Sequence, residues 1–341
     1  QIDGALGTAV ETDNNPPPLA SWVQEFQEHA FLCREAANQH YLRFSKRFRP
    51  ESFPPSNYLE VGNPGDALQC AVKIAGMLGV FTRLTKYRVM GNDVSGFVSA
   101  EALSRRGTPS PMAVIPTEFG VIFPGRDGIY LTNLITTDQP LSDDIFQLFI
   151  GETVNGMSPI NWNQATTMAA AVYKNRYYLA YPSGSASNPD RIAVYSRDTK
   201  RWYFYDHPMR SLFVEEDVDD LIGGSTNGFV YILEDGSTDD GSNIALDVET
   251  KDFGGENASQ RKLFRYLRPD INTQGQNVSI EMYVDGTLKR TATVNSNRTR
   301  PLVAFPEASL GYQWRARIRY TGSSRIRGFG LECLWLPLPL A

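Results

Sequence analysis

Residues 168–205 read MAAAVYKNRYYLAYPSGSASNPDRIAVYSRDTKRWYFY. Four runs rich in apolar and aromatic residues lie in this stretch, and residues typical of turns separate them. The runs cover 168–172, 175–180, 191–195 and 202–205. Four consecutive short strands form one twisted sheet, and such a sheet cannot bury both of its faces by itself. The stretch therefore predicts one unit of an architecture in which several sheets stack.

The same plan recurs on both sides of this stretch. Strand-like runs with glycine turns fill 67–90 and 112–131 before it, and 220–233 after it. The units recur about every 40 to 55 residues, and a strand-built repeat of that length is typical of β-propeller blades. We expect an all-β chain in which residues 41–250 form a propeller of about five to seven blades.

The last ninety or so residues follow a different plan. Runs at 262–268 and 278–284 lead to an Asp285-Gly286 turn, which is a strong hairpin signal. The alternating run 314–320 and a closing strand near 328–335 follow. We expect residues 251–341 to form a β-sandwich-like module that closes or decorates the propeller.

The alternating run places three arginines, Arg315, Arg317 and Arg319, on one face of a strand. Three guanidinium groups on one face can bind the carboxylates or phosphates of a partner. An exposed charged face that protects a sheet edge from aggregation is the alternative. Trp314 and Tyr320 lie on the opposite face, so the arginines have no base-stacking platform beside them. We interpret the three arginines as a contact with another subunit rather than with DNA.

Charge is unevenly distributed along the chain, whose net charge is -5. Residues 206–249 contain 12 acidic residues and one basic residue, whereas residues 250–341 contain 14 basic and 7 acidic residues. The densest acidic run holds Glu215, Glu216, Asp217, Asp219 and Asp220. A pair of catalytic carboxylates, a solvated loop, and an acidic lining that repels DNA phosphates in a channel are three interpretations of this run.

The first 40 residues differ from the rest. Three prolines stand at 16–18, and apolar residues in 19–40 have roughly helical spacing after Ser21, a candidate N-cap. We expect residues 1–40 to be an N-terminal extension, with one helix, that contacts a partner.

Motifs that bind cofactors or metals are missing from the sequence. The three cysteines, at 33, 70 and 333, show no metal-ligand spacing, and the three histidines form no HExxH motif. Neither a P-loop nor a GxGxxG motif after a strand is present. The stretch 235–241 departs from the calcium-loop pattern. We therefore expect no cofactor, no bound metal, no catalytic residue and no membrane insertion.

Several stretches have a family likeness. They are a strand, a serine and a proline-rich link within 41–62, a strand pair ending in a glycine turn at 78–91, the run GVIFPGRDGIY at 120–130, and three short C-terminal pieces at 262–265, 283–286 and 328–332. Together they resemble the β-propeller tail proteins of short-tailed bacteriophages, called nozzle or packaged-DNA stabilisation proteins.

The resemblance implies a structural protein of the virion tail rather than an enzyme. It implies a ring of copies, with a hexamer expected, that lies against adjacent tail and adaptor proteins. Such a ring forms part of the DNA conduit, retains the packaged genome, and lets double-stranded DNA pass during ejection without reading its sequence. The acidic run 215–220 would line this channel.

Two other functions stay open, because propellers support many functions. One is a glycan-active enzyme, a glycosidase or lyase, with opposed carboxylates in an axial pocket. The other is a glycan-binding or host-recognition propeller without catalysis. A closed ring of copies would distinguish the structural protein from both.

Overall fold

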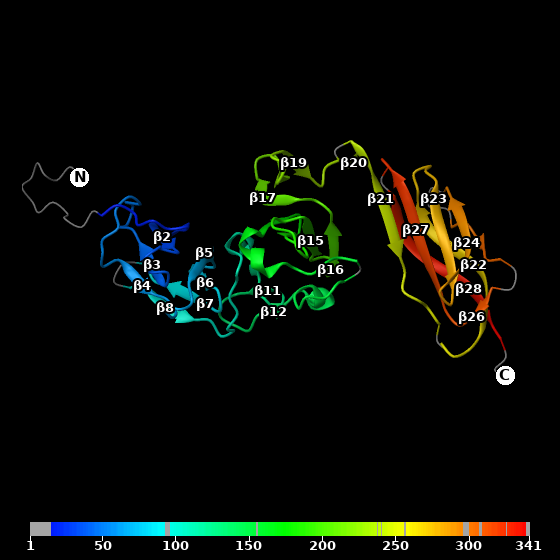
Figure 1. The fold of residues 1–341 in the computed structure, drawn as a ribbon, viewed down its shortest axis with the longest axis horizontal. Helices are drawn as coiled ribbons and strands as arrows, with labels where there is room; N and C mark the ends of the chain where they lie inside the picture. Colours follow the sequence, from blue (N-terminus) through cyan, green and yellow to red (C-terminus); the bar gives the residue numbers. More distant parts are fainter. Residues whose placement is uncertain are drawn as a thin grey trace, which may run out of the picture. The chain divides into compact units, whose positions relative to one another are not determined.

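The computed structural model describes residues 15–338 apart from 93–95, 155, 237, 240, 256, 296–299, 307–308 and 325. The chain divides into two compact units, Gln1–Glu234 and Asp235–Ala341 (Figure 1). In the part that is described, no helix is both long and apolar enough to cross a membrane.

The described part of the first unit contains five antiparallel sheets, each built from strands consecutive in sequence. The first four sheets have four strands each, and the fifth has three. In chain order the strands are β1 (Trp22–Phe26), β2 (His29–Cys33), β3 (Tyr41–Phe44) and β4 (Tyr58–Glu60); β5 (Leu68–Ile74), β6 (Met77–Thr82), β7 (Lys86–Met90) and β8 (Val98–Glu101); β9 (Ile115–Thr117), β10 (Gly120–Pro124), β11 (Ile129–Thr132) and β12 (Gln139–Pro140); β13 (Ala169–Tyr173), β14 (Arg176–Tyr181), β15 (Arg191–Ser196) and β16 (Arg201–Tyr205); and β17 (Met209–Glu215), β18 (Asp220–Ser225) and β19 (Val230–Leu233). Short 3-10 helices lie at Pro111–Ala113, Asp143–Leu148 and Trp162–Thr167.

The five sheets stack as propeller blades do. The first strand of each sheet lies beside the first strand of the next, in the order β1, β5, β9, β13 and β17. A separate apolar cluster fills the space between each pair of neighbouring sheets. The predicted all-β fold with propeller-like blades is therefore confirmed, and the number of sheets lies within the predicted range.

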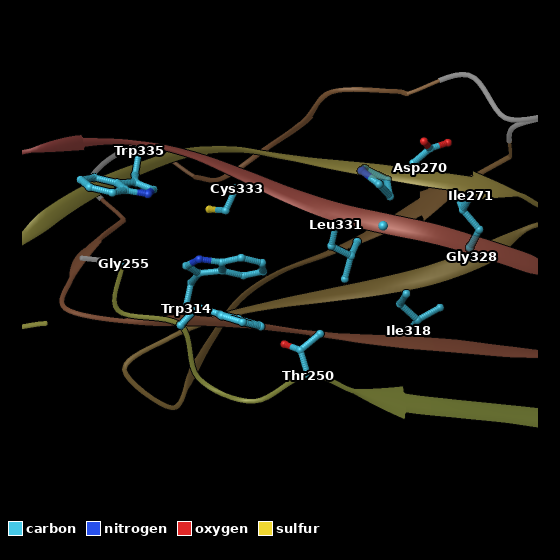
Figure 2. Close-up of a pocket in the computed structure, with 13 residues that line it drawn as sticks. Thr250, Gly255, Asp270, Ile271, Trp314, Ile318, Gly328, Leu331, Cys333 and Trp335 are labelled. Atoms are coloured by element: carbon cyan, nitrogen blue, oxygen red, sulfur yellow. The ribbon is translucent and has the colours of Figure 1, made fainter. Parts of the chain in front are cut away.

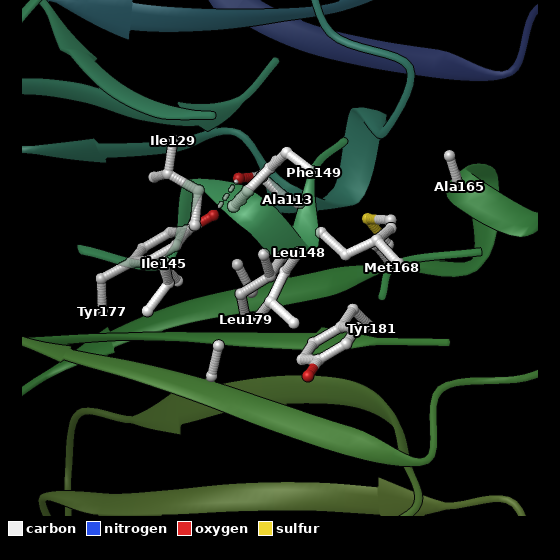
Figure 3. Close-up of a cluster of buried hydrophobic side chains, with 13 residues drawn as sticks. Ala113, Ile129, Ile145, Leu148, Phe149, Ala165, Met168, Tyr177, Leu179 and Tyr181 are labelled. Carbon is white, nitrogen blue, oxygen red and sulfur yellow. Dashed lines mark hydrogen bonds between the residues drawn. The ribbon is translucent and has the colours of Figure 1, made fainter. Parts of the chain in front are cut away.

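The cluster between the third and fourth sheets shows how these spaces are filled (Figure 3). Ile129 of the third sheet and Leu179 of the fourth are buried in it, beside Leu148 of a 3-10 helix. The hydroxyl of Tyr177 donates a hydrogen bond of 3.0 Å to the carbonyl oxygen of Ala113, so this buried polar group has a partner.

A buried ion pair joins the second and third sheets. Lys86 Nζ of β7 lies 2.7 Å from Asp138 Oδ2, which precedes β12, and both side chains are 0% exposed. Lys86 also donates to the carbonyl oxygens of Ser104 and Arg106. Hydrogen bonds to these carbonyls and to the carboxylate replace those that the lysine ammonium group would make with water.

The helix expected within 19–40 was a wrong prediction. Residues 22–33 form the β1–β2 hairpin, in which Gln27 and Glu28 have φ values of 51° and 65° and make the tight turn. Sheet pairing decides here, because Phe26 and Phe31 bury their rings against the second sheet. The predicted extension thus ends before residue 22, and its residues 1–14 lie outside the described part of the chain.

The second unit is a β-sandwich with its own core. One sheet has the order β20 (Thr238–Asp239), β21 (Ser242–Glu249), β27 (Trp314–Gly322), β23 (Val278–Val284) and β24 (Thr287–Val294). The other sheet is built on β22 (Lys262–Asn272), which pairs with β25 (Val303–Ala304), β26 (Leu310–Gly311) and β28 (Arg327–Pro337).

The predicted sandwich-like module and its Asp285-Gly286 hairpin are both present. The boundary lies between residues 234 and 235 rather than at 250. Strand β21 causes the difference, because it pairs with β27 of the sandwich over Ile244–Glu249. That pairing partner is distant in sequence, so no local pattern marks it.

Candidate interaction surfaces

Charged turns of neighbouring sheets contact each other at one end of the first unit. Glu118 and Phe119, in the first turn of the third sheet, meet Arg197, in the last turn of the fourth. The Arg197 guanidinium lies 3.7 Å from the carboxylate and over the Phe119 ring. Lys174 of the fourth sheet likewise pairs with Asp219 of the fifth at 3.4 Å. Turns at this end are therefore contact elements between sheets.

The predicted acidic run forms the turn between β17 and β18. Glu215 ends β17, Asp220 begins β18 and pairs with it in register, and the three acidic residues between them are exposed. Asp219 is the member that contacts another sheet, through Lys174 and through its carbonyl oxygen, which accepts from Tyr173. The run is thus one exposed hairpin turn, and its role as a channel lining stays a prediction.

An apolar row crosses the fifth sheet on the face that points away from the fourth. The register sets Phe213, Ile222 and Ile232 side by side on the three strands. Phe213 is 58% and Ile232 53% exposed, and Val230 lies in the next row of the same face. The opposite face is buried against the fourth sheet through residues such as Leu221. We call the exposed face of Phe213, Ile222, Val230 and Ile232 the end face.

This end face was not predicted from the sequence. The segments 212–214 and 230–233 have apolar residues at consecutive positions, so both faces of the fifth sheet carry apolar side chains. A strand apolar on both faces is normally buried on both faces. This departure from alternation was the available signal.

The first sheet has an outer face at the other end of the row of sheets. Val23, Leu32, Arg43 and Tyr58 are cross-strand neighbours on it, and Val23 is 63% exposed. Arg43 pairs with Glu35 and stacks over the Tyr58 ring. No apolar cluster joins this face to the end face within the described residues.

A basic loop lies at one end of the first sheet. It has the sequence Lys46-Arg47-Phe48-Arg49 and follows β3. Phe48 is 70% exposed, and its amide donates to the carbonyl oxygen of Glu28 in the β1–β2 turn. The Arg47 side chain pairs with Glu28 as well. The basic loop thus lies at the same end of its sheet as the first turn.

The three predicted arginines line one face of β27, as the alternation requires. Each has an acidic partner within its own sheet. Arg315 pairs with Glu249 at 2.8 Å, Arg317 makes two bonds of 2.6 Å to Asp247, and Arg319 lies 3.1 Å from Glu281. The Arg317 guanidinium holds the pKa of Asp247 below its usual range. These ion pairs, which we call the arginine ladder, give each of the three arginines a partner within the same chain. A further contact of the arginines with another subunit stays a prediction.

We expect the Arg317→Glu variant to unfold at a slightly lower temperature than the wild type in dilute buffer. The loss should disappear near 1 M salt, because the pair is exposed and salt of about that concentration screens beyond roughly 3 Å. Thermal unfolding followed by circular dichroism at two salt concentrations measures it. An equal loss at both concentrations would show that packing, rather than charge, holds the ladder.

The sandwich has an apolar groove between its sheets, with a volume of about 560 Å³. Figure 2 shows Trp314, Ile318 and Leu331 extending toward the same space. The groove continues past Cys333 to Trp335, and Asp270 also lines it. Asp270 Oδ2 accepts from Arg300, whereas Oδ1 is buried without a hydrogen-bond partner among the described residues.

The described ranges contain no group of three or more histidine, cysteine or carboxylate side chains placed to hold a metal ion.

Burial raises the pKa of the Cys33 thiol to about 12.

No protein-family model and no curated protein sequence matches the chain. Several solved structures are similar at low identity. The Pan2 WD40 domain of Neurospora crassa is 8% identical, with a TM-score of 0.38, and the match covers 67% of this chain and 64% of that one. The extracellular domain of a proposed one-component system of B. thetaiotaomicron is 9% identical, with a TM-score of 0.43, and the match covers 88% of this chain and 37% of that one.

An exo-beta-1,3-galactanase of Phanerochaete chrysosporium is 8% identical, with a TM-score of 0.33, and the match covers 94% of this chain and 96% of that chain. The chain thus spans less than two thirds of the first two of these proteins. These likenesses concern the arrangement of strands only.

Proposed function

We propose that this chain is a structural protein of a bacteriophage tail, where copies form a ring around the passage for DNA. The ring retains the packaged genome and permits its ejection. The observation that carries the proposal is the end face. It is a row of exposed or half-buried apolar side chains on a sheet whose other face packs against the fourth sheet, and such a patch marks a surface for protein contact.

The sequence resemblance over about residues 40–335 supports the same function. Its stretches lie in both units, at 78–91 and 120–130 in the blades and at 283–286 in the sandwich. The net charge of -5 also suits a conduit, because a protein of negative net charge does not attract DNA phosphates by its overall charge.

Negative-stain microscopy of the purified full chain at high concentration tests the proposal. We expect closed rings with a central opening, and antibodies against the chain should label the tail end of virions. A chain that is absent from virions would contradict the proposal.

A second candidate function is recognition of a glycan by the groove of the sandwich. Trp314 and Trp335 offer indole rings there, and Asp270 Oδ1 is an acceptor without a partner among the described residues. Binding sites that combine apolar walls with a few polar groups are typical for small ligands. A glycan array and titration with the full chain test it, with Leu331→Arg as the variant that fills the groove. Binding that this variant loses would favour the second candidate.

A further inference from the structure

We infer that the end face of one copy packs against the outer face of the first sheet in a second copy. The contact is head-to-tail, so that every copy uses both surfaces. The inference rests on the proposed ring and names the surfaces that would build it. Three observations lead to it.

The first observation is that the contact continues an interface present four times within the chain. The inner strands β1, β5, β9, β13 and β17 stack in turn, each sheet against the next. Among the described residues of the first unit, the first and fifth sheets each have a neighbouring sheet on one side, and Figure 1 shows β2 and β3 at one end of this row and β17 and β19 at the other. A sheet with an apolar face is stable when another sheet covers that face. The first sheet of a second copy would supply this cover.

The second observation is that both terminal faces carry apolar side chains on their first two strands. Phe213 and Ile222 occupy β17 and β18 of the end face. Val23, which is 63% exposed, occupies the corresponding first strand of the first sheet, and Leu32 beside it on the second strand is 8% exposed. If the two copies stack as neighbouring sheets within the chain do, these two pairs of strands come together. Removing the largely exposed Phe213 and Val23 from water would stabilise the contact.

The third observation is charge complementarity at one end of both sheets. The acidic turn 215–220 joins the first two strands of the fifth sheet. The basic loop 46–49 lies beside the equivalent turn of the first sheet, as its bonds to Glu28 show. Packing of the two faces would therefore bring the acidic turn to the basic loop. Opposite charges at such a rim favour the correct partner and orientation.

The chain contains a precedent for this pairing. Glu118 and Phe119 lie in the first turn of the third sheet and meet Arg197 in the last turn of the fourth. In the inferred contact, Glu216 and Asp217 of the fifth sheet take the place of Glu118, and Arg47 of the second copy takes the place of Arg197. The acidic turn then belongs to the contact between copies, in place of the channel lining predicted from sequence.

A head-to-tail contact produces a closed ring when its rotation closes, and an open helix otherwise. Because each copy has one surface of each kind, two variants can separate the surfaces. Phe213→Glu disables the end face and leaves the first sheet intact. Val23→Glu does the reverse. Both positions are exposed, so the substitutions should leave folding nearly unchanged.

The experiment measures molar mass by sedimentation and light scattering of the full chain up to about 100 μM, a range that detects even micromolar affinities. We expect the wild type to associate, each variant alone to be monomeric, and an equal mixture of the two to form a dimer that grows no further. Leu103→Glu is the matched control, because Leu103 is 69% exposed but lies on neither face. It should associate like the wild type.

Charge gives a second measurement. Asp217→Arg should weaken association about tenfold or more, and adding Arg47→Glu in the same chain should recover most of the loss. No recovery would overturn the pairing of turn and loop.

Other results would overturn the contact itself. They are a wild type that stays monomeric throughout, variants that associate normally, or a dimer of the Phe213→Glu variant alone. If each single variant still forms rings, the contact is refuted and the proposed function is not affected. A mixed dimer together with virions that lack the chain would confirm the contact and refute the proposed function.

Discussion

Replacement of Lys86 by methionine is expected to lower the free energy of unfolding of the first unit by about 3–5 kcal/mol. Lys86 and Asp138 are fully buried between the second and third sheets, and Nζ lies 2.7 Å from Oδ2. Methionine fills a similar volume but leaves the carboxylate without its counter-charge. A buried charge without a partner is among the most destabilising changes that one substitution can cause.

Urea unfolding of the full chain, followed by tryptophan fluorescence, measures this loss. The control is the double variant Lys86→Met with Asp138→Leu, which removes both charges and should be more stable than the single variant. A single variant within about 0.5 kcal/mol of the wild type would show that the pair is not important for stability.

The same ion pair predicts a pH dependence. Burial lowers the pKa of Lys86 below that of a free lysine, although Asp138 opposes the shift. Between the folded pKa and about 10.4, the value in an unfolded chain, the unfolded state binds more protons. Stability contributed by this group therefore rises with pH in that interval. The Lys86→Met variant should lack this part of the rise, and parallel urea titrations at several pH values would measure it.

Replacement of Tyr177 by alanine is expected to cost about 3–5 kcal/mol, the usual range when a large buried aromatic side chain is removed. Tyr177 is 1% exposed and lies in the cluster between the third and fourth sheets (Figure 3). Its ring contributes the packing, and its hydroxyl donates to the carbonyl oxygen of Ala113. Both contributions join elements far apart in the sequence.

Tyr177→Phe separates the two contributions. It keeps the ring and removes the hydroxyl, so it should cost only about 1 kcal/mol, the usual net value of one hydrogen bond. Urea unfolding of both variants gives the comparison. Equal losses in the two variants would mean that the hydrogen bond, rather than the packing, holds the third sheet to the fourth.

Much of the fold could be predicted because strands and turns leave local patterns. The runs in 168–205 became β13 to β16, and the Asp285-Gly286 turn became the β23–β24 hairpin. The helix expected in 19–40 shows the limit of such patterns. Apolar residues there fit a helical spacing, but the segment forms the β1–β2 hairpin, because that pairing buries Phe26 and Phe31 against the second sheet.

The candidate surfaces were predicted less completely. The arginines lie on one side of β27, as the alternation predicted, and the acidic run, one interpretation of which was a solvated loop, is an exposed hairpin turn. Their partners were not predictable, since Arg317 binds Asp247, which is 70 residues away. The end face was missed for a similar reason. Its exposure depends on which sheet lies beside the fifth, and that is a tertiary property.

By itself, the sequence determined the all-β class, the recurrence of short antiparallel sheets and the side of each strand on which its arginines lie. Those properties depend on neighbours within a few residues, which alternation and turn chemistry record directly. The tertiary structure alone decided the boundary after residue 234, the pairing of β21 with the sandwich, and the uncovered face of Phe213 and Ile232. Each depends on contacts between distant segments, and burial in such contacts is a property of the packed sheets together.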